Sequence, residues 1–184
     1  MRIVLCRHGE TQWSRSGQHT SFSDIPLTQT GESQAKDLRQ KLSKINVSQV
    51  YTSPMQRAKR TCELAGFSNF LIEPLAVEWN YGTYEGLTTP EIWNTNPNWN
   101  VFLNGAPGGE TPDQVACRAD QLIEKWTRDK KDILLFSHAH FLRTLAARWI
   151  YLSPAAGRNF GLTVASISVL GFERNQRIIE SWNN

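Results

Sequence analysis

The sequence predicts an α/β fold, a three-layer sandwich in which helices flank a mostly parallel central sheet. Two short, continuous apolar runs, Ile3–Cys6 and Ile133–Phe136, have the length and composition of strands that are buried on both faces of a sheet. Segments whose apolar residues recur at helical spacing follow both runs. Strands that alternate with helices in this way build a mostly parallel sheet covered by helices.

The first half of the chain is expected to run loop, helix, strand, helix, strand. Thr28 can cap the first helix, and Pro54 suits the opening turn of the second, which Gly66 ends. In order, the expected elements are a polar loop at 11–27, a helix with apolar positions Ala35, Leu38, Leu42 and Ile45, a strand at 49–52, a helix opened by Ser53-Pro54, and a strand at 70–72.

A long helix, a buried strand and a further helix are expected in the second half. Before them, residues 78–109 contain no clear strand and one short helix, begun by Thr89-Pro90. The remaining elements are a helix from Thr111-Pro112 with Val115, Ala119, Leu122 and Trp126 on one face, the strand at 133–136, a helix through Leu142, Leu145, Ala146 and Trp149, and strands at 164–172 and 176–182. The last two strands are expected to form a hairpin at the edge of the sheet.

Size, charge and cysteine content narrow the class of protein. A length of 184 residues, 40% of them hydrophobic, fits a single globular domain over residues 1–184. The net charge of +3 comes without a basic run, which argues against nucleic acid or a membrane as partner but is compatible with a small anionic substrate. Cys6, Cys62 and Cys117 are sparse, so we expect buried, reduced thiols in a cytoplasmic protein without a secretory signal.

Two of the predicted strands end in similar residues. Arg7-His8 follows the first run, and Ser137-His138 follows the second. Ligands of open α/β sheets bind at the carboxyl ends of the strands, so neighbouring strands would bring both histidines to one crevice. Arg57, at the start of a helix, belongs to the same edge. Such guanidinium and imidazole groups suit a tetrahedral dianion. Considered without the other motifs, Arg57 fits a surface position on a helix equally well. The alternative for His138 is a core histidine that is hydrogen-bonded to the backbone.

Six short motifs, spread over most of the chain, carry the most specific information. They are Arg7-His8-Gly9-Glu10-Thr11, Leu27-Thr28-x-x-Gly31, Ser53-Pro54-x-x-Arg57-Ala58, Glu78-x-x-Tyr81-Gly82-x-x-Glu85-Gly86, Gly109-Glu110-Thr111 and Ser137-His138. In order and spacing they resemble the motifs of the histidine phosphatase superfamily, also called phosphoglycerate-mutase-like. Within it, the chain looks most similar to the sedoheptulose-bisphosphatase-like branch of sugar phosphatases. The resemblance implies the phosphoglycerate-mutase-like version of the α/β sandwich.

The resemblance also implies roles for individual residues. His8 is then the nucleophile that becomes phosphohistidine, and Glu78 is the acid and base. Arg7, Arg57 and His138 form the phosphate pocket, in which a protonated His138 would add a third cation. Because the arginines supply the positive charge, no metal or cofactor is expected. Further substrate contacts are expected at Ser14, Thr20, Ser21, Tyr81, Ala139 and His140.

Some expectations concern the residues around this site. A nucleophilic His8 must be neutral at the attacking nitrogen, so its other ring nitrogen should donate to a backbone carbonyl. At position 14, where the family often has asparagine, this chain has a serine, which is a shorter donor. Glu85 is expected to bind loop backbone, and Glu10 is expected to order its loop. Packing is the expected role of Trp79, Trp93 and Trp99, with a sugar-facing wall as the alternative.

The activity expected from these features is hydrolysis of a small phosphorylated metabolite, a sugar phosphate or bisphosphate, through a phosphohistidine. A phosphoglycerate mutase is the alternative within the family. A phospho-ligand binding domain without turnover is an alternative of another class, and a metal hydrolase built from His138-Ala139-His140 with His8, His19 and Asp24 is a third. An exposed edge strand near Ile178 would allow a homodimer.

Overall fold

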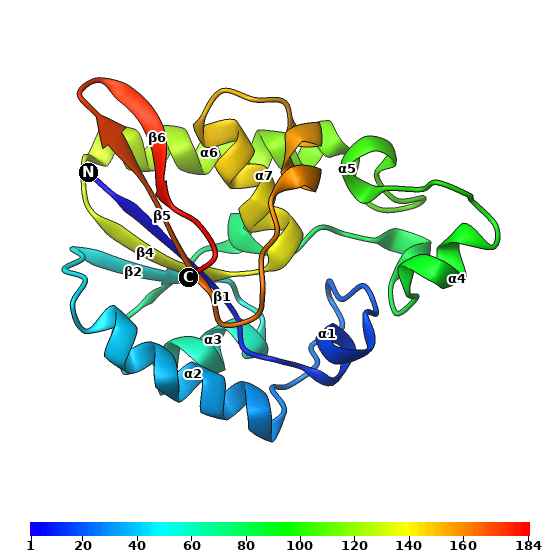
Figure 1. Cartoon of the computed structure of the whole chain (residues 1–184), viewed down its shortest axis with the longest axis horizontal. Helices are drawn as coiled ribbons and strands as arrows, with labels where there is room; N and C mark the ends of the chain where they lie inside the picture. Colours follow the sequence, from blue (N-terminus) through cyan, green and yellow to red (C-terminus); the bar gives the residue numbers. More distant parts are fainter.

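A six-stranded sheet forms the centre of the computed structural model, which describes all 184 residues (Figure 1). Its strands are β1 (Ile3–Arg7), β2 (Gln49–Thr52), β3 (Leu71–Ile72), β4 (Ile133–Ser137), β5 (Ile167–Glu173) and β6 (Gln176–Ser181), in the spatial order β3-β2-β4-β1-β5-β6. The first four strands in this order run parallel, whereas β5 and β6 form an antiparallel hairpin at one edge. The predicted α/β class with a mostly parallel sheet is confirmed.

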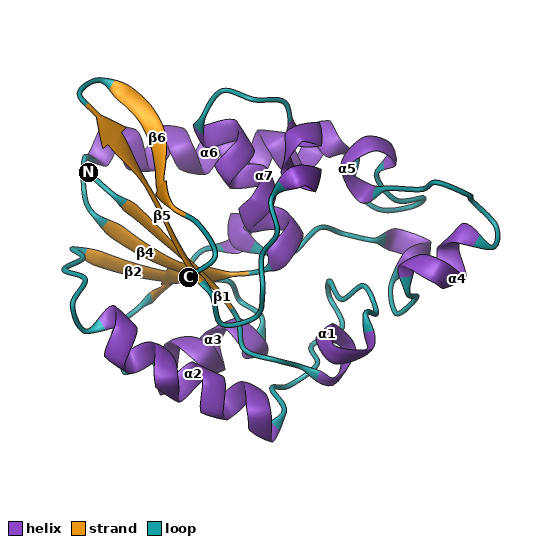
Figure 2. Ribbon diagram, in the orientation of Figure 1, coloured by secondary structure: helices purple, strands orange, loops and turns teal.

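Helices cover both faces of the sheet (Figure 2). The α-helices are α1 (Gln12–Ser16), α2 (Gln29–Leu42), α3 (Gln56–Leu64), α4 (Thr89–Trp93), α5 (Val101–Asn104), α6 (Pro112–Asp129) and α7 (Ala139–Trp149). Short 3₁₀ turns occupy Pro74–Ala76, Gly82–Tyr84 and Pro154–Asn159. Helices α6 and α7 lie on one face and α2 and α3 on the other, while α1, α4 and α5 lie beyond the carboxyl ends of the parallel strands.

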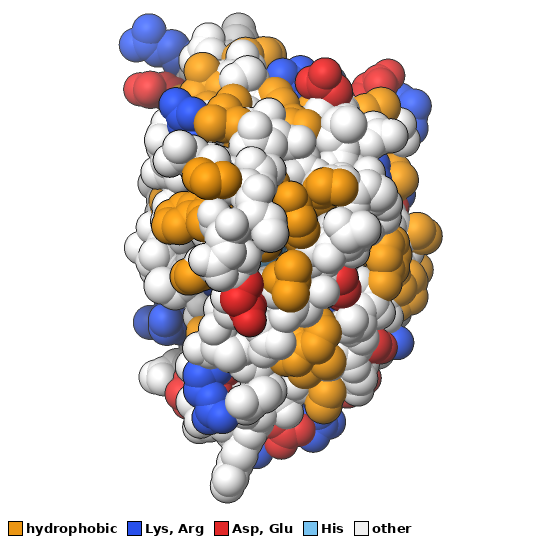
Figure 3. Space-filling model, turned by 90° about the vertical axis from the view of Figure 1, so that its right-hand side faces the viewer, with side chains coloured by type: hydrophobic (Ala, Val, Ile, Leu, Met, Phe, Trp, Pro, Cys, Tyr) orange, Lys and Arg blue, Asp and Glu red, His pale blue; other side chains and the backbone are white.

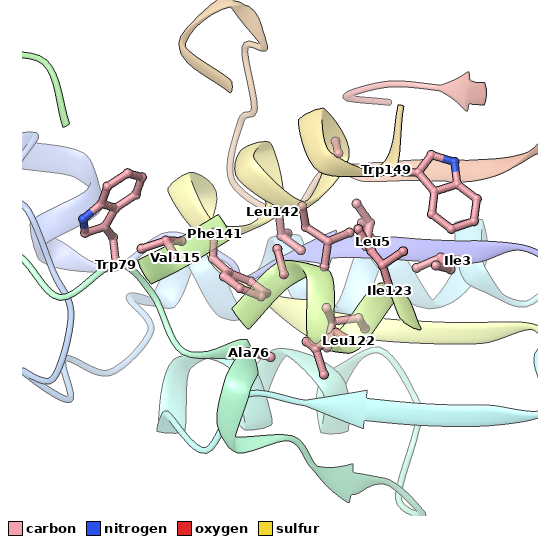
Figure 4. Packing of buried hydrophobic residues seen from close by; sticks show 14 of the residues in the cluster. Ile3, Leu5, Ala76, Trp79, Val115, Leu122, Ile123, Phe141, Leu142 and Trp149 are labelled. Carbon is pink, nitrogen blue, oxygen red and sulfur yellow. The ribbon is translucent and has the colours of Figure 1, made fainter. Parts of the chain in front are cut away.

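Alternate residues of β1 point into opposite layers, as the pleat of a strand requires. Ile3 and Leu5 belong to the larger core, beneath α6 and α7, and Val4 and Cys6 to the smaller core, against α2 and α3. Figure 4 shows side chains of α6 and α7 gathered beside the side chains of β1. Because Ile3, Val4, Leu5 and Cys6 are all buried, each in its own layer, the end of the strand is held in place for Arg7 and His8.

Strand register places the two predicted histidines together. Arg7 is paired with Ser137 across β1 and β4, and the backbone amide of His8 donates to the carbonyl oxygen of Ser137 over 3.0 Å. His138 follows directly as the N-cap of α7. The convergence of two strand ends at one sheet edge is therefore observed as predicted.

Four local expectations are wrong. Residues 78–109 contain two short helices, α4 and α5, rather than one, because the Asn100 side chain caps a second helical turn. The polar loop at 11–27 contains α1, because Thr11 and Ser14 form a reciprocal capping box that starts a helical turn. Helix α3 begins at Gln56 rather than at Ser53-Pro54, since the Ser53 amide still donates to Phe136 of β4 and keeps the backbone extended. Cys117 is exposed on α6, whereas Cys6 and Cys62 are buried as expected.

Candidate active site

A hollow of about 190 Å³ opens at the carboxyl ends of β1 and β4. Side chains from the end of β1, from the α1 region, from the segment after β3, from α7 and from the loop before β5 surround it. Its lining residues are Arg7, His8, Ser14, Gly17, Gln18, His19, Thr20, Glu78, Tyr81, Ala139, His140, Arg143 and Leu162. Most of the lining is polar and is placed at the sheet edge where open α/β sheets bind their ligands.

The ring of His8 is held in one tautomer. Its Nδ1 lies 2.7 Å from the carbonyl oxygen of Gly9, which can only accept, so Nδ1 carries the hydrogen and donates it. Burial, with the nearby Arg57 and Arg7, lowers the pKa of His8 well below its ordinary value. The ring is therefore neutral at pH 7, and Nε2 has a free lone pair. The predicted hydrogen bond to a backbone carbonyl is present.

His138 lies behind His8, with 5.2 Å between the ring centroids, and is fully buried. Its Nδ1 accepts a hydrogen bond of 3.2 Å from Nε of Arg57, and its Nε2 lies 2.8 Å from Oγ of Ser53. Burial and the charge of Arg57 lower the pKa of His138 well below its ordinary value. The expectation that His138 supplies a third cation is wrong here, because the guanidinium uses the lone pair that a proton would need.

Arg57 is fully buried, and all three of its guanidinium nitrogens bind protein. Besides Nε on His138, Nη1 donates to the carbonyl oxygen of Ser23 over 3.1 Å, and Nη2 donates to Ser21 over 2.9 Å and to Thr20 over 3.3 Å. Arg57 does not line the hollow. Arg57 holds the loop at 20–23 against His138 and so stabilises the site.

Arg7 lines the hollow directly and keeps donors unused. Its Nη1 donates to the carbonyl oxygen of Leu162 over 2.6 Å, while its buried Nε has no partner. Burial lowers the pKa of Arg7, and Glu78 opposes that shift. Nη2 has no protein partner and, unlike Nε, is not buried, so it is the nitrogen that can donate to an oxyanion in the hollow.

The carboxylate of Glu78 is buried and sits at the start of α7. Oε1 accepts from the backbone amides of Trp79 (2.9 Å) and Phe141 (2.8 Å), and Oε2 accepts from that of His140 (3.1 Å). Glu78 thus caps α7, whose N-cap His138 has no side-chain capping bond. Oε2 keeps a free lone pair that can take up a proton. The Glu78 side chain lines the hollow together with His8.

Five of the six residues predicted as further substrate contacts line the hollow: Ser14, Thr20, Tyr81, Ala139 and His140. Ser21 does not, because its amide binds Glu85 and its carbonyl oxygen accepts from Arg57. The Ser14 hydroxyl is engaged with Thr11 in the capping box. The Tyr81 hydroxyl and Nδ1 of His140 share a hydrogen bond of 2.5 Å, and burial keeps the phenol protonated and the imidazole neutral by raising the pKa of Tyr81 and lowering that of His140.

Sequence reasoning missed Arg143 as a lining residue. It stands four residues after Ala139 and three after His140, so all three share one face of α7. That spacing was available in the sequence once a helix was predicted there. The other lining residues not singled out as contacts are Gly17, Gln18, His19 and Leu162.

The structural expectations hold for Glu85, Glu10, Trp79 and Trp99, but not for Trp93. Both carboxylate oxygens of Glu85 accept from the amide of Ser21, and one also accepts from that of Ser23. Glu10 accepts a hydrogen bond from the Thr28 hydroxyl. Trp79 and Trp99 are buried, as the packing role requires, but Trp93 is half exposed.

The metal-hydrolase alternative needs at least three ligands to converge, and they do not. Both ring nitrogens of His138 bind protein, and Nδ1 of His140 binds Tyr81. Asp24 accepts from the amide of Gln56 and faces Arg57 at 4.0 Å. No group of three His, Cys, Asp or Glu residues is placed to hold an ion.

This fold, with a neutral histidine and a guanidinium side by side at the strand ends, defines a class of enzyme that acts on phosphorylated substrates. The chain belongs to the histidine phosphatase superfamily (branch 1), whose family model matches residues 3–184. The chain is similar to an acid phosphatase of Mycobacterium tuberculosis, at 41% identity over 96% of this chain and 89% of that protein. It is also similar to sedoheptulose 1,7-bisphosphatase of Saccharomyces cerevisiae, at 32% identity over 82% of this chain and 68% of that protein.

A solved structure of an open reading frame from Mycobacterium tuberculosis has the same fold. It superposes with a TM-score of 0.96 at 39% identity, over 99% of this chain and 96% of that one. The predicted family, the predicted fold and the prediction of a phosphatase are thereby confirmed. None of the helices has both the length and the apolar character needed to cross a bilayer.

Proposed function

We propose that this chain is a metal-independent phosphomonoesterase that hydrolyses a small phosphorylated metabolite through a phosphohistidine on His8. The observation that carries the proposal is the tautomer of His8. Its Nδ1–H is held by the Gly9 carbonyl oxygen, so the lone pair of Nε2 is available in the hollow that Arg7 also lines, and Nη2 of Arg7 has no protein partner. A neutral imidazole with a fixed hydrogen is a competent nucleophile toward phosphorus.

In the first step, Nε2 of His8 attacks phosphorus, the P–N bond forms and the P–O bond to the alcohol breaks. The three equatorial oxygens carry the charge of this transition state, and Arg7 offers fixed donors to them. A sugar alkoxide is a poor leaving group, so it needs a proton as it departs. Glu78 is the proposed donor and enters this step as the carboxylic acid, with its proton on Oε2, which accepts one backbone hydrogen bond where Oε1 accepts two.

In the second step, water attacks phosphorus, the P–N bond breaks and inorganic phosphate leaves. Glu78, now a carboxylate, takes a proton from the attacking water and is ready for the next ester. His8 recovers the neutral form that its pKa favours. No residue changes its total proton count over the cycle, so the chemistry balances with water as the only co-reactant.

We propose a sugar phosphate as the natural substrate, supported by the similarity to sedoheptulose 1,7-bisphosphatase. Free Cys6 and Cys62 fit the proposed reducing, cytoplasmic location. We expect no nucleic acid or membrane as partner. The proposal of a homodimer rests on β6, which is the unpaired edge of the sheet and carries Ile178.

The test is His8→Ala, assayed with para-nitrophenyl phosphate and with an acid-labile phosphate trap. The wild type should release phosphate and, when quenched during turnover, retain label on the protein, whereas the variant should do neither while its circular dichroism is unchanged. Label at full level in the variant would overturn the assignment of His8. Transfer of phosphate between the hydroxyls of 3-phosphoglycerate at a rate above hydrolysis would favour the mutase instead.

A further inference from the structure

A second hollow, of about 120 Å³, lies beside the first. His19, His140 and Arg143 line both, so the two hollows share a wall. The second is lined by His19, Thr89, Trp93, Trp99, Asn100, Val101, Phe102, His140 and Arg143. The volume is close to that of the ~150 Å³ cavity that takes up benzene in an engineered protein, so a six-membered ring is of the right size for it.

Aromatic rings dominate the second hollow, and their polar atoms are already satisfied. Nε1 of Trp93 donates to the carbonyl oxygen of Trp99 over 2.9 Å, and Nε1 of Trp99 donates to Gly105 over 2.8 Å. Trp93 nevertheless leaves 48% of its surface exposed. The indole of Trp93 is held in place by the hydrogen bond from its nitrogen and is about half exposed, so it offers an apolar surface against which a ring can pack.

Positive charge in this second hollow comes from Arg143 alone. Its Nε donates to Gly157 and its Nη2 to Arg158, both over 3.0 Å, and the guanidinium stacks on Phe102 at 4.5 Å. Only Nη1 is left without a protein partner, whereas strong recognition of a phosphate uses paired donors. On the end of the molecule that bears α4 and α5, Lys and Arg lie toward the rim, and the middle shows apolar and uncharged polar side chains with a few Asp and Glu (Figure 3).

The shared wall is suited to uncharged polar groups. Burial lowers the pKa of His19 to about 4, so this imidazole is neutral at pH 7. The ring of His140 is neutral as well, and its Nε2 has no protein partner, so Nε2 is free to bind a hydroxyl group. Hydroxyl groups of a substrate that bridges the two hollows can therefore bind to His19 and His140, the two neutral members of the wall, whereas Arg143 is its charged member.

We infer that the second hollow binds an uncharged ring on the alcohol part of the substrate, so the preferred ester carries one phosphate and one ring rather than two phosphates. The inference rests on the proposed function, which places the reacting phosphate in the first hollow. It deepens that function by naming the substrate class, and it selects against a bisphosphate.

The experiment compares kcat/KM for 2-phenylethyl phosphate and ethyl phosphate. Both release primary alcohols that need the same proton, so the ratio reports the ring. We expect a ratio of about ten or more in the wild type, from stacking and apolar burial. Trp93→Ala should lower this ratio about fivefold, and Trp93→Phe should retain most of it. The matched control is Leu71→Ala, equally exposed but on β3, which should leave the ratio unchanged.

A ratio near one in the wild type, or the same ratio in Trp93→Ala, overturns the inference. So does a preference of more than tenfold for fructose 1,6-bisphosphate over fructose 6-phosphate, measured as release of the first phosphate. If the wild type hydrolyses neither ethyl nor para-nitrophenyl phosphate, the proposed function fails. The ring preference is then decided by calorimetric Kd values of 2-phenylethyl and ethyl phosphate for the same variants.

Discussion

Replacement of Glu78 by glutamine separates a proton donor from a helix cap, because the carboxylate is placed to be both. As an acid, Glu78 helps only when the departing oxygen needs a proton. As a cap, it holds α7, and with it His138 and His140, whatever the substrate is. The two roles therefore predict different dependences on the leaving group, while both predict some loss of stability.

The structural part of the effect follows from the three amide hydrogen bonds. A glutamine whose oxygen replaces Oε1 keeps the bonds from Trp79 and Phe141 but turns its NH₂ toward the amide of His140. Loss of one hydrogen bond to a charged acceptor costs about 1.5–3 kcal/mol, so the free energy of unfolding should fall by about 2–3 kcal/mol. Urea unfolding measures this directly.

The chemical part appears in the burst phase, which isolates phosphorylation of His8. General acid catalysis contributes ~10²–10⁴-fold to the rate, so in Glu78→Gln the burst rate of His8 phosphorylation by an alkyl phosphate should fall by about that factor. Para-nitrophenyl phosphate should slow far less, because its phenolate leaves without a proton. The control is Glu85→Gln, whose carboxylate also binds backbone amides but does not line the hollow. An equal loss on both substrates would refute the acid role and leave only the cap.

Three further predictions test the site. Activity should survive prolonged EDTA, and phosphate and vanadate should compete with substrate; inactivation that a divalent ion reverses would favour a metal enzyme. Arg57→Lys should lower the free energy of unfolding by about 3 kcal/mol or more in urea, since one ammonium cannot serve Thr20, Ser21, Ser23 and His138; a loss below about 1 kcal/mol would contradict this. Because the pKa of His19 falls to about 4 in the folded chain, the unfolded chain binds the extra proton below about pH 6.5, and stability should fall by about 2 kcal/mol from pH 8 to pH 5 through this group alone. His19→Gln should remove that share, and an unchanged pH dependence in this variant would count against it.

Elements that depend on local pattern could be predicted from the sequence. The run Ile133–Phe136 forms β4 almost as expected, because a buried strand needs little more than its own apolar residues. The start of α3 could not be predicted, since it depends on a hydrogen bond from Ser53 to Phe136, which lies far along the chain. Local propensity favours a helix that starts at Pro54, but the backbone of Ser53 pairs with β4, so the helix starts only at Gln56.

The same distinction applies to the site. His8 and His138 were predictable neighbours, because strand order in a parallel sheet brings strand ends together. The charge state of His138 was not, because it depends on one nitrogen of Arg57, 81 residues away. Ser21 was expected to contact substrate and instead gives its backbone to Glu85 and Arg57. Whether a hydrogen-bond donor of the site is free for substrate depends on all of its partners in the folded chain, and these come from distant segments.

An excess of positive charge links the stability of this site to its function. The pKa values of Arg7, His8, Arg57, His138 and Arg143 are all lowered, with burial as the largest cause in each. Each group is therefore held where its cationic form is disfavoured, and Glu78 is the carboxylate that eases this for all three arginines. A phosphate dianion between Arg7 and His8 would supply the missing negative charge. The stabilisation of the phosphoryl oxygens by these groups is largest in the transition state, where negative charge collects on the oxygens. The burial that lowers the stability of the folded chain therefore favours phosphoryl transfer over simple anion binding.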